Sequence, residues 1–173
     1  MNVPSLWVCH EGREAHLRVV GRGSFQNAGL LKDVSARLFD QGARQFTFDL
    51  SECETMDSTF LGVLAGLAIR LRSNQGNAAL THATGRTKEL VENMSLDQLL
   101  TVLEDGGNGL STEEHHAVTP PIGSARADSS TVLQAHETLS SLSDSNRRAF
   151  QDVVQYLRAE LKKDRPPKPG DTP

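Results

Sequence analysis

The sequence has few of the features that mark several large classes of protein. Its 173 residues include only two cysteines, Cys9 and Cys53, which lie too far apart to form the closely spaced pair of a typical metal site. Two isolated thiols are expected to be reduced, as in a cytosolic protein. No block of basic residues stands out, and the formal net charge is −4. Neither nucleic-acid binding nor attraction to an anionic membrane is therefore supported.

Long apolar runs are also missing. No stretch approaches the roughly 18 apolar residues that span a bilayer, so we expect no direct membrane insertion. The first residues, MNVPSLWVCHEGREAH, lack the basic start and apolar core of a signal peptide, and a cytoplasmic location is expected. Hydrophobic residues make up 37% of the chain, which is low for a domain packed from end to end. Part of the chain is therefore expected to be linker or tail.

Two kinds of apolar pattern alternate along the first part of the sequence. Period-two alternation predicts strands, and apolar residues three and four apart predict helices. Helices are expected after a cap at Asn27 as far as Gly42, from Ser58 to Arg72, and from a cap at Thr84 to about Met94. A last short strand or turn is expected within 96–103. The predicted strands are 5–9, 15–20 (paired with the first through a turn at 11–13), 44–50 and 78–82.

Strands that alternate with helices favour an α/β fold with parallel crossovers and one antiparallel edge pair. This unit is expected to occupy residues 1–105. Residues 106–129 contain glycines, serines and Pro120-Pro121 without an apolar period, and are predicted to be a flexible linker. Two narrow apolar stripes predict a helical hairpin over 130–163, followed by a disordered tail at 164–173. So small a hairpin is expected to dock on the main domain, to pair with a second copy as a homodimer, or to order on a partner.

A group of polar residues, Asp57-Ser58-Thr59, stands where a strand and a short loop lead into the second helix. An acid or a hydroxyl can accept hydrogen bonds from the free backbone N–H groups of a helix N-terminus, so the group could be only a cap. Two hydroxyls and an acid are more than one cap requires. The group also follows the carboxyl end of a strand, where α/β sheets present functional residues.

The same segment resembles a known family. Phe48-Asp49-Leu50-Ser51, followed by Met56-Asp57-Ser58-Thr59 and an apolar helix, resembles the STAS domain of bacterial anti-sigma factor antagonists, over roughly residues 3–105. The resemblance implies a STAS-like mixed β-sheet with helices packed on it. It also implies that Ser58 is phosphorylated by a serine-protein kinase that doubles as an anti-sigma factor, with Thr59 as the alternate acceptor. A PP2C-type phosphatase would reverse the modification.

The expected partner surface surrounds the acceptor. It comprises Asp57, Thr59 and Phe60, with Ser24 and Phe25 from the loop before the first helix as weaker candidates. Many members of the family have a small glycine where this chain has Phe60. Phe60 is therefore either an apolar anchor for the partner or a core residue, and the sequence leaves both open.

Other functions receive less support from the sequence. His115-His116 lies beside two glutamates in the linker, but no further ligand converges there, so we expect no metal. Gly21-Arg22-Gly23 lacks the continuation of a phosphate-binding loop. His82 could approach Ser58, yet no glycine elbow surrounds the serine, and we expect neither an enzyme nor a cofactor. The runner-up is a STAS-like regulatory subunit of a membrane transport assembly, for lipid or sulfate, that is not phosphorylated.

Overall fold

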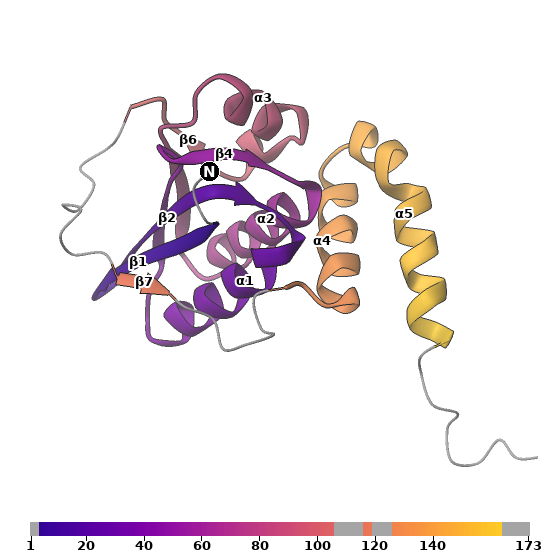
Figure 1. The fold of residues 1–173 in the computed structure, drawn as a ribbon, viewed down its shortest axis with the longest axis horizontal. Helices are drawn as coiled ribbons and strands as arrows, with labels where there is room; N and C mark the ends of the chain where they lie inside the picture. The colour runs from indigo at the N-terminus through magenta and orange to yellow at the C-terminus, as the bar shows by residue number, and fades with distance from the viewer. Residues whose placement is uncertain (1–3, 106–115, 119–125, 164–173) are drawn as a thin grey trace, which may run out of the picture.

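The computed structural model describes residues 4–105, 116–118 and 126–163. Among these residues it forms one mixed sheet with helices stacked in layers beside it (Figure 1). The strands are β1 (Ser5–Glu11), β2 (Glu14–Gly23), β3 (Gln45–Asp49), β4 (Cys53–Met56), β5 (Asn77–Thr81), β6 (Thr101–Val102) and β7 (His116–Val118). The helices are α1 (Phe25–Asp40), α2 (Ser58–Arg72), α3 (Gly85–Asn93), a short 3-10 turn (Leu96–Gln98), α4 (Ser129–Leu142) and α5 (Asp144–Lys163).

The strand order along the sheet is β6-β5-β3-β2-β1-β7, and β4 pairs with the end of β2. β1 and β2 form an antiparallel hairpin around Gly12, whose φ of 57° lies in the left-handed region that glycine tolerates. β2, β3, β5 and β6 run parallel, joined by helical crossovers. The predicted α/β fold with a mixed sheet is confirmed.

The alternation in the strands sorts the side chains between two faces of the sheet. Ala15, Leu17 and Val19 of β2 are buried, whereas His16 and Arg18 between them are only partly covered. Burial of large apolar side chains is the main stabilising contribution to such a layer. The largest fully buried side chains include Phe46, Phe48, Phe60, Leu17, Leu31, Leu61, Leu64, Leu71 and Leu80.

The C-terminal helices form two further layers. α4 packs against α2, and α5 packs against α4 on the side away from the sheet (Figure 1). The approach of α4 to α2 is very close: a Cβ added to Gly62 would lie 2.4 Å from the carbonyl oxygen of Ala135. The sequence left three arrangements of the helical hairpin open, and in this structure the hairpin is docked on the main domain.

Three local predictions are wrong. The predicted N-cap of α1 was Asn27, but the N-cap is Ser24, because β2 continues through Gly23. Asn27 is the third helical residue, and its Oδ1 accepts from the Ser24 N–H at 2.8 Å. Strand β4 was expected to be loop. Strand β7 falls inside the expected linker and pairs with β1, so β1 is not the edge of the sheet. His115 and the tail from 164 lie outside the described residues.

Candidate functional site

Asp57 joins the first turns of two helices. It is the N-cap of α2, and its Oδ1 accepts a hydrogen bond from the Phe60 N–H at 2.9 Å. Its Oδ2 accepts from the Phe25 N–H at 2.8 Å, at the start of α1. One carboxylate therefore satisfies free N–H groups of both helices, at the ends where negative charge is stabilised. The capping prediction is confirmed, and the same contact brings Phe25 beside the α2 terminus.

Ser58 is the first residue of α2 and is partly buried. Its Oγ lies 2.9 Å from Nε2 of His136, which α4 contributes. Nδ1 of the same imidazole lies 2.8 Å from the carbonyl oxygen of Val132. Because a carbonyl only accepts, Nδ1 carries the proton of the neutral ring and Nε2 is the acceptor. The Ser58 hydroxyl therefore donates to His136.

His136 is itself held firmly in place. Only 6% of the residue is exposed, and its ring meets Phe150 of α5 edge-on, with the ring centroids 5.4 Å apart. His136 is not among the site residues predicted from the sequence. A signal was present: His136 is four residues after Val132 and three before Leu139, so it lies on the apolar stripe that faces the domain.

Thr59 and Phe60 lie inside the protein. Thr59 is 5% exposed and Phe60 is 1% exposed. The Phe60 ring fills the space beside Gly23, where an added Cβ would lie 2.8 Å from the Phe60 Cδ1. Phe60 is therefore a core residue. The other alternative, an exposed apolar anchor for the partner, is wrong, because α2 directs the Phe60 side chain toward β2. Thr59 likewise presents little accessible surface here.

Ser24 and Phe25 lie at the beginning of α1 and are partly covered. The Ser24 hydroxyl accepts from the Gln26 N–H at 3.3 Å. Phe25 is contacted by the segment that leads into α4: the guanidinium of Arg126 lies 5.0 Å from its ring centroid, and its carbonyl oxygen accepts from the Ala127 N–H at 2.7 Å. The C-terminal segment thus touches both Ser58 and Phe25.

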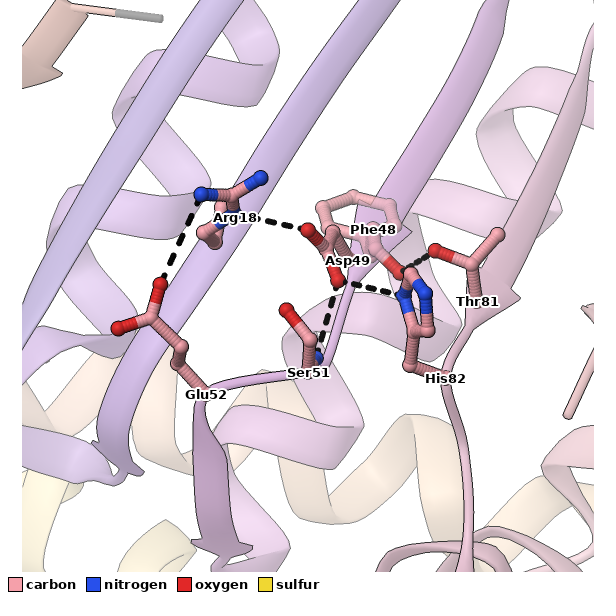
Figure 2. Close-up of polar contacts among 7 residues, drawn as sticks. All are labelled: Arg18, Phe48, Asp49, Ser51, Glu52, Thr81 and His82. Carbon is pink, nitrogen blue, oxygen red and sulfur yellow. Dashed lines mark hydrogen bonds and ion pairs between the residues drawn. The ribbon is translucent and has the colours of Figure 1, made fainter. Parts of the chain in front are cut away.

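A second polar cluster lies where β3 and β5 end (Figure 2). The Oδ2 atom of Asp49 accepts a hydrogen bond from Nε of Arg18 at 2.8 Å. Its Oδ1 atom lies 2.8 Å from Nδ1 of His82. Oδ1 also accepts from the Ser51 N–H at 2.9 Å. Burial acts to raise the pKa of Asp49, but the hydrogen bonds from Ser51, Arg18 and His82 outweigh it and hold that pKa below its ordinary value. His82 is therefore bound to Asp49, and the histidine bonded to Ser58 is His136.

A cavity of about 290 Å³ follows the seam between α4 and the pair α1 and α2. Lys32, Ser35, Gly66 and Thr131 are among the residues that line it. Nζ of Lys32 donates to the Thr131 hydroxyl at 2.8 Å. The Ser35 hydroxyl is buried and has no hydrogen-bond partner. The contact between α4 and the domain is thus bordered on this side by a cavity that is partly open to solvent.

The described residues lack two further features, a membrane-spanning helix and a metal-binding cluster. None of the helices in this part of the chain is long and apolar enough to cross a membrane. The same residues contain no group of three or more His, Cys, Asp or Glu side chains arranged to hold a metal ion.

Known structures share the fold of the main domain. A putative anti-sigma factor antagonist from Thermotoga maritima is 21% identical, with a TM-score of 0.52 over 56% of this chain and 83% of that chain. SpoIIAA, an anti-sigma factor antagonist from Bacillus solved in its unphosphorylated form, is 14% identical, with a TM-score of 0.50 over 60% of this chain and 90% of its own. At these identities the likeness establishes the fold alone.

The sequence comparisons separate the main domain from the C-terminal helices. A search of curated proteins finds no match to the chain. A family profile described as "Mlab, STAS domain" matches residues 8–103 and stops before α4 and α5. Since this match spans more than half of the 173 residues, the protein belongs to the STAS domain family.

Proposed function

We propose that the protein is an anti-sigma factor antagonist controlled by phosphorylation of Ser58. In this proposal it binds an anti-sigma factor with serine kinase activity while Ser58 is unmodified, and releases it when Ser58 carries a phosphate. The observation that carries the proposal is the position of the Ser58 hydroxyl at the first residue of α2, beside the carboxylate of Asp57. Membership of the STAS family and a fold shared with two named antagonists support it.

The chemistry of the helix terminus favours a switch that acts on binding rather than on folding. A phosphate adds roughly −1.5 to −2 charges and three acceptor oxygens. The N-terminus of α2 tolerates such an anion, because backbone N–H groups and the helix dipole favour negative charge there. Asp57 already places one negative charge beside Ser58. A partner shaped for a neutral hydroxyl and one carboxylate would meet repulsion, and a few kcal/mol are enough to move a complex from mostly bound to mostly free.

The surface offered to the partner is smaller than the sequence suggested. It consists of Ser58 and Asp57, with Ser24 and Phe25 held alongside by the contact between Asp57 and the Phe25 N–H. Thr59 remains the alternate acceptor in the proposal, but its burial requires local opening before a kinase can reach it. A PP2C-type phosphatase in the cytoplasm would restore the hydroxyl. The role is regulatory, and it assigns no catalysis to this chain.

The direct test compares variants of the acceptor. Ser58→Ala should keep binding to the cognate kinase, whereas Ser58→Asp should weaken it about tenfold or more, measured by calorimetry, because the added carboxylate lies beside Asp57. Ser73→Asp is the matched control, since Ser73 is exposed at the opposite end of α2. Phosphosite mapping on protein isolated from its host should find Ser58 modified. Equal affinity of Ser58→Ala and Ser58→Asp for the kinase would remove Ser58 as the switch.

One observation favours the alternative of a STAS-type regulatory subunit in a membrane transport assembly. The Ser58 hydroxyl is already engaged by His136 and partly buried, as expected of a serine that serves structure. This alternative predicts that Ser58 is never phosphorylated in the host, so the mapping experiment separates the two. Dimerisation through the C-terminal helices stays a prediction; Val153 and Tyr156 of α5 are exposed at 39% and 64%, and sedimentation would test it.

A further inference from the structure

The C-terminal helices cover the site to which the proposed function assigns the switch. We propose that α4 is an internal occupant of the partner surface, and that docking of α4 and phosphorylation of Ser58 exclude one another. This inference rests on the proposed function and adds its regulation. It places the control in α4 and α5, which lie outside the residues matched by the family profile.

Docked α4 engages the hydroxyl that a kinase would have to modify. A kinase needs the serine oxygen free to attack a phosphoryl group, and it needs a base that takes the hydroxyl proton. In the docked state that proton is donated to Nε2 of His136, 2.9 Å away, and the ring is fixed by the Val132 carbonyl and by Phe150. Since α4 supplies both His136 and Val132, transfer to Ser58 requires α4 to move away first.

The C-terminal segment covers more of the proposed partner surface than Ser58 alone. The segment before α4 contacts Phe25 through the Ala127 N–H and the Arg126 guanidinium. Further along, the backbone of α4 at Ala135 lies directly on Gly62 of α2. These contacts span the start of α1 and the first turns of α2, which is the surface proposed for the partner. A protein that docks there must displace α4.

The contact between α4 and the domain has two features that favour its release. The cavity of about 290 Å³ lies along the seam, and the hydroxyl of Ser35, one of its lining residues, is buried without a hydrogen-bond partner. Across the seam, Lys32 donates a hydrogen bond to the Thr131 hydroxyl, and its positive charge helps to lower the pKa of Asp128, the N-cap of α4. Unfilled volume and unsatisfied polar groups reduce the stability of a packed contact. α5 packs on α4, and Nδ2 of its Asn146 donates to the Met94 carbonyl of the main domain at 2.8 Å. The two helices can leave together once this bond is broken.

Phosphorylation should in turn keep α4 away. A phosphorylated Ser58 has no hydroxyl proton to donate, and its phosphate would need the space in which Nε2 of His136 lies 2.9 Å from the Ser58 Oγ. Two events that each disfavour the other are linked by one coupling free energy, so the effect is reciprocal. Docked α4 slows phosphorylation, and phosphorylated Ser58 remains open to a phosphatase.

Two glycines of α2 provide a matched pair for the test. Gly62→Ala places a methyl group against the Ala135 backbone, whereas Gly66→Ala places the same group where no atom lies within 4 Å. Both changes improve helix propensity equally, so their difference reports the contact with α4. Hydrogen exchange at pH 8 should show α4 amides exchanging at least about tenfold faster in Gly62→Ala than in Gly66→Ala. Amides of β3 serve as the control for global unfolding.

A second pair examines Ser58 without any partner. Both Ser58→Ala and Ser58→Asp remove the donated proton, but only Ser58→Asp adds charge. Ser58→Asp should release α4 by the same measure, and Ser58→Ala should release it much less. If both Gly62→Ala and Ser58→Asp leave α4 as protected as their controls do, the proposed exclusion is wrong.

The kinase then separates this inference from the function on which it rests. Gly62→Ala should be phosphorylated at Ser58, and should bind the kinase, about tenfold better than Gly66→Ala. Faster exchange of α4 with equal phosphorylation of the two variants would overturn the role of α4 as a competitor. Faster exchange with no phosphorylation of any variant would overturn the proposed function and support the coupling between Ser58 and α4.

Discussion

The contact of Asp57 with two helices makes a quantitative prediction about stability. Replacing Asp57 with alanine removes the cap of α2, typically about 1 kcal/mol. It also removes a hydrogen bond from the Phe25 N–H to a charged acceptor, about 1.5–3 kcal/mol. The free energy of unfolding should therefore fall by about 2–4 kcal/mol. For a chain of this size that corresponds to a fall in Tm of about 10 °C.

Denaturant unfolding followed by circular dichroism measures this loss. Asp128→Ala is the matched control, because Asp128 is the N-cap of one helix, α4, where it accepts from the Thr131 N–H at 2.7 Å. Asp57→Asn should be intermediate, since an amide keeps one acceptor oxygen but turns donor hydrogens toward the other N–H group. If Asp57→Ala costs no more than Asp128→Ala, the carboxylate does not stabilise both helices, and the account of how Phe25 comes to lie beside Ser58 fails.

Two further predictions concern ionisable groups away from Ser58. Because the pKa of Asp49 is lowered in the folded protein, its ionised form stabilises the fold above the ordinary value of 3.8, and this contribution is lost as pH falls through the lowered value. The unfolding free energies of the wild type and Asp49→Asn should thus differ most at neutral pH and converge in acid; a constant difference would contradict this. Burial raises the pKa of Cys53 to about 11 from 9.0. At pH 8 the thiolate fraction of Cys53, and with it the alkylation rate, should therefore be about a hundredfold lower in the native protein than in the protein unfolded in urea. Peptide mapping separates Cys53 from Cys9, and equal rates in both states would refute the prediction.

The sequence predicts the elements whose stability is local or strongly patterned. The alternation in β2 and β3 and the helical spacing after Asp57 reflect burial of one face, so both were visible without a structure. Strand β4 has four residues and β7 has three, and each exists only because another strand lies beside it. Such short pairings are tertiary contacts, and residue patterns do not encode them.

The candidate site was predicted in part. The position and capping role of Asp57 follow from residue type and from the start of an apolar helix. Phe60 belongs to the apolar face of that same helix, so the pattern already contained the buried alternative. The partner of Ser58 could not be predicted, because 78 residues separate Ser58 from His136 and their contact depends on how α4 packs on α2.

Strand β7 determines how far a released α4 can travel. Val118 is hydrogen-bonded into the sheet through β1, and α4 begins at Ser129 with its cap at Asp128. Ten residue steps reach at most about 36 Å even when fully extended. A helix confined to a sphere of that radius is present at a local concentration of several millimolar. A partner at a micromolar concentration therefore competes with tethered α4, whose local concentration is about a thousand times higher. Its apparent affinity will be set as much by how often α4 leaves as by the contacts it makes itself.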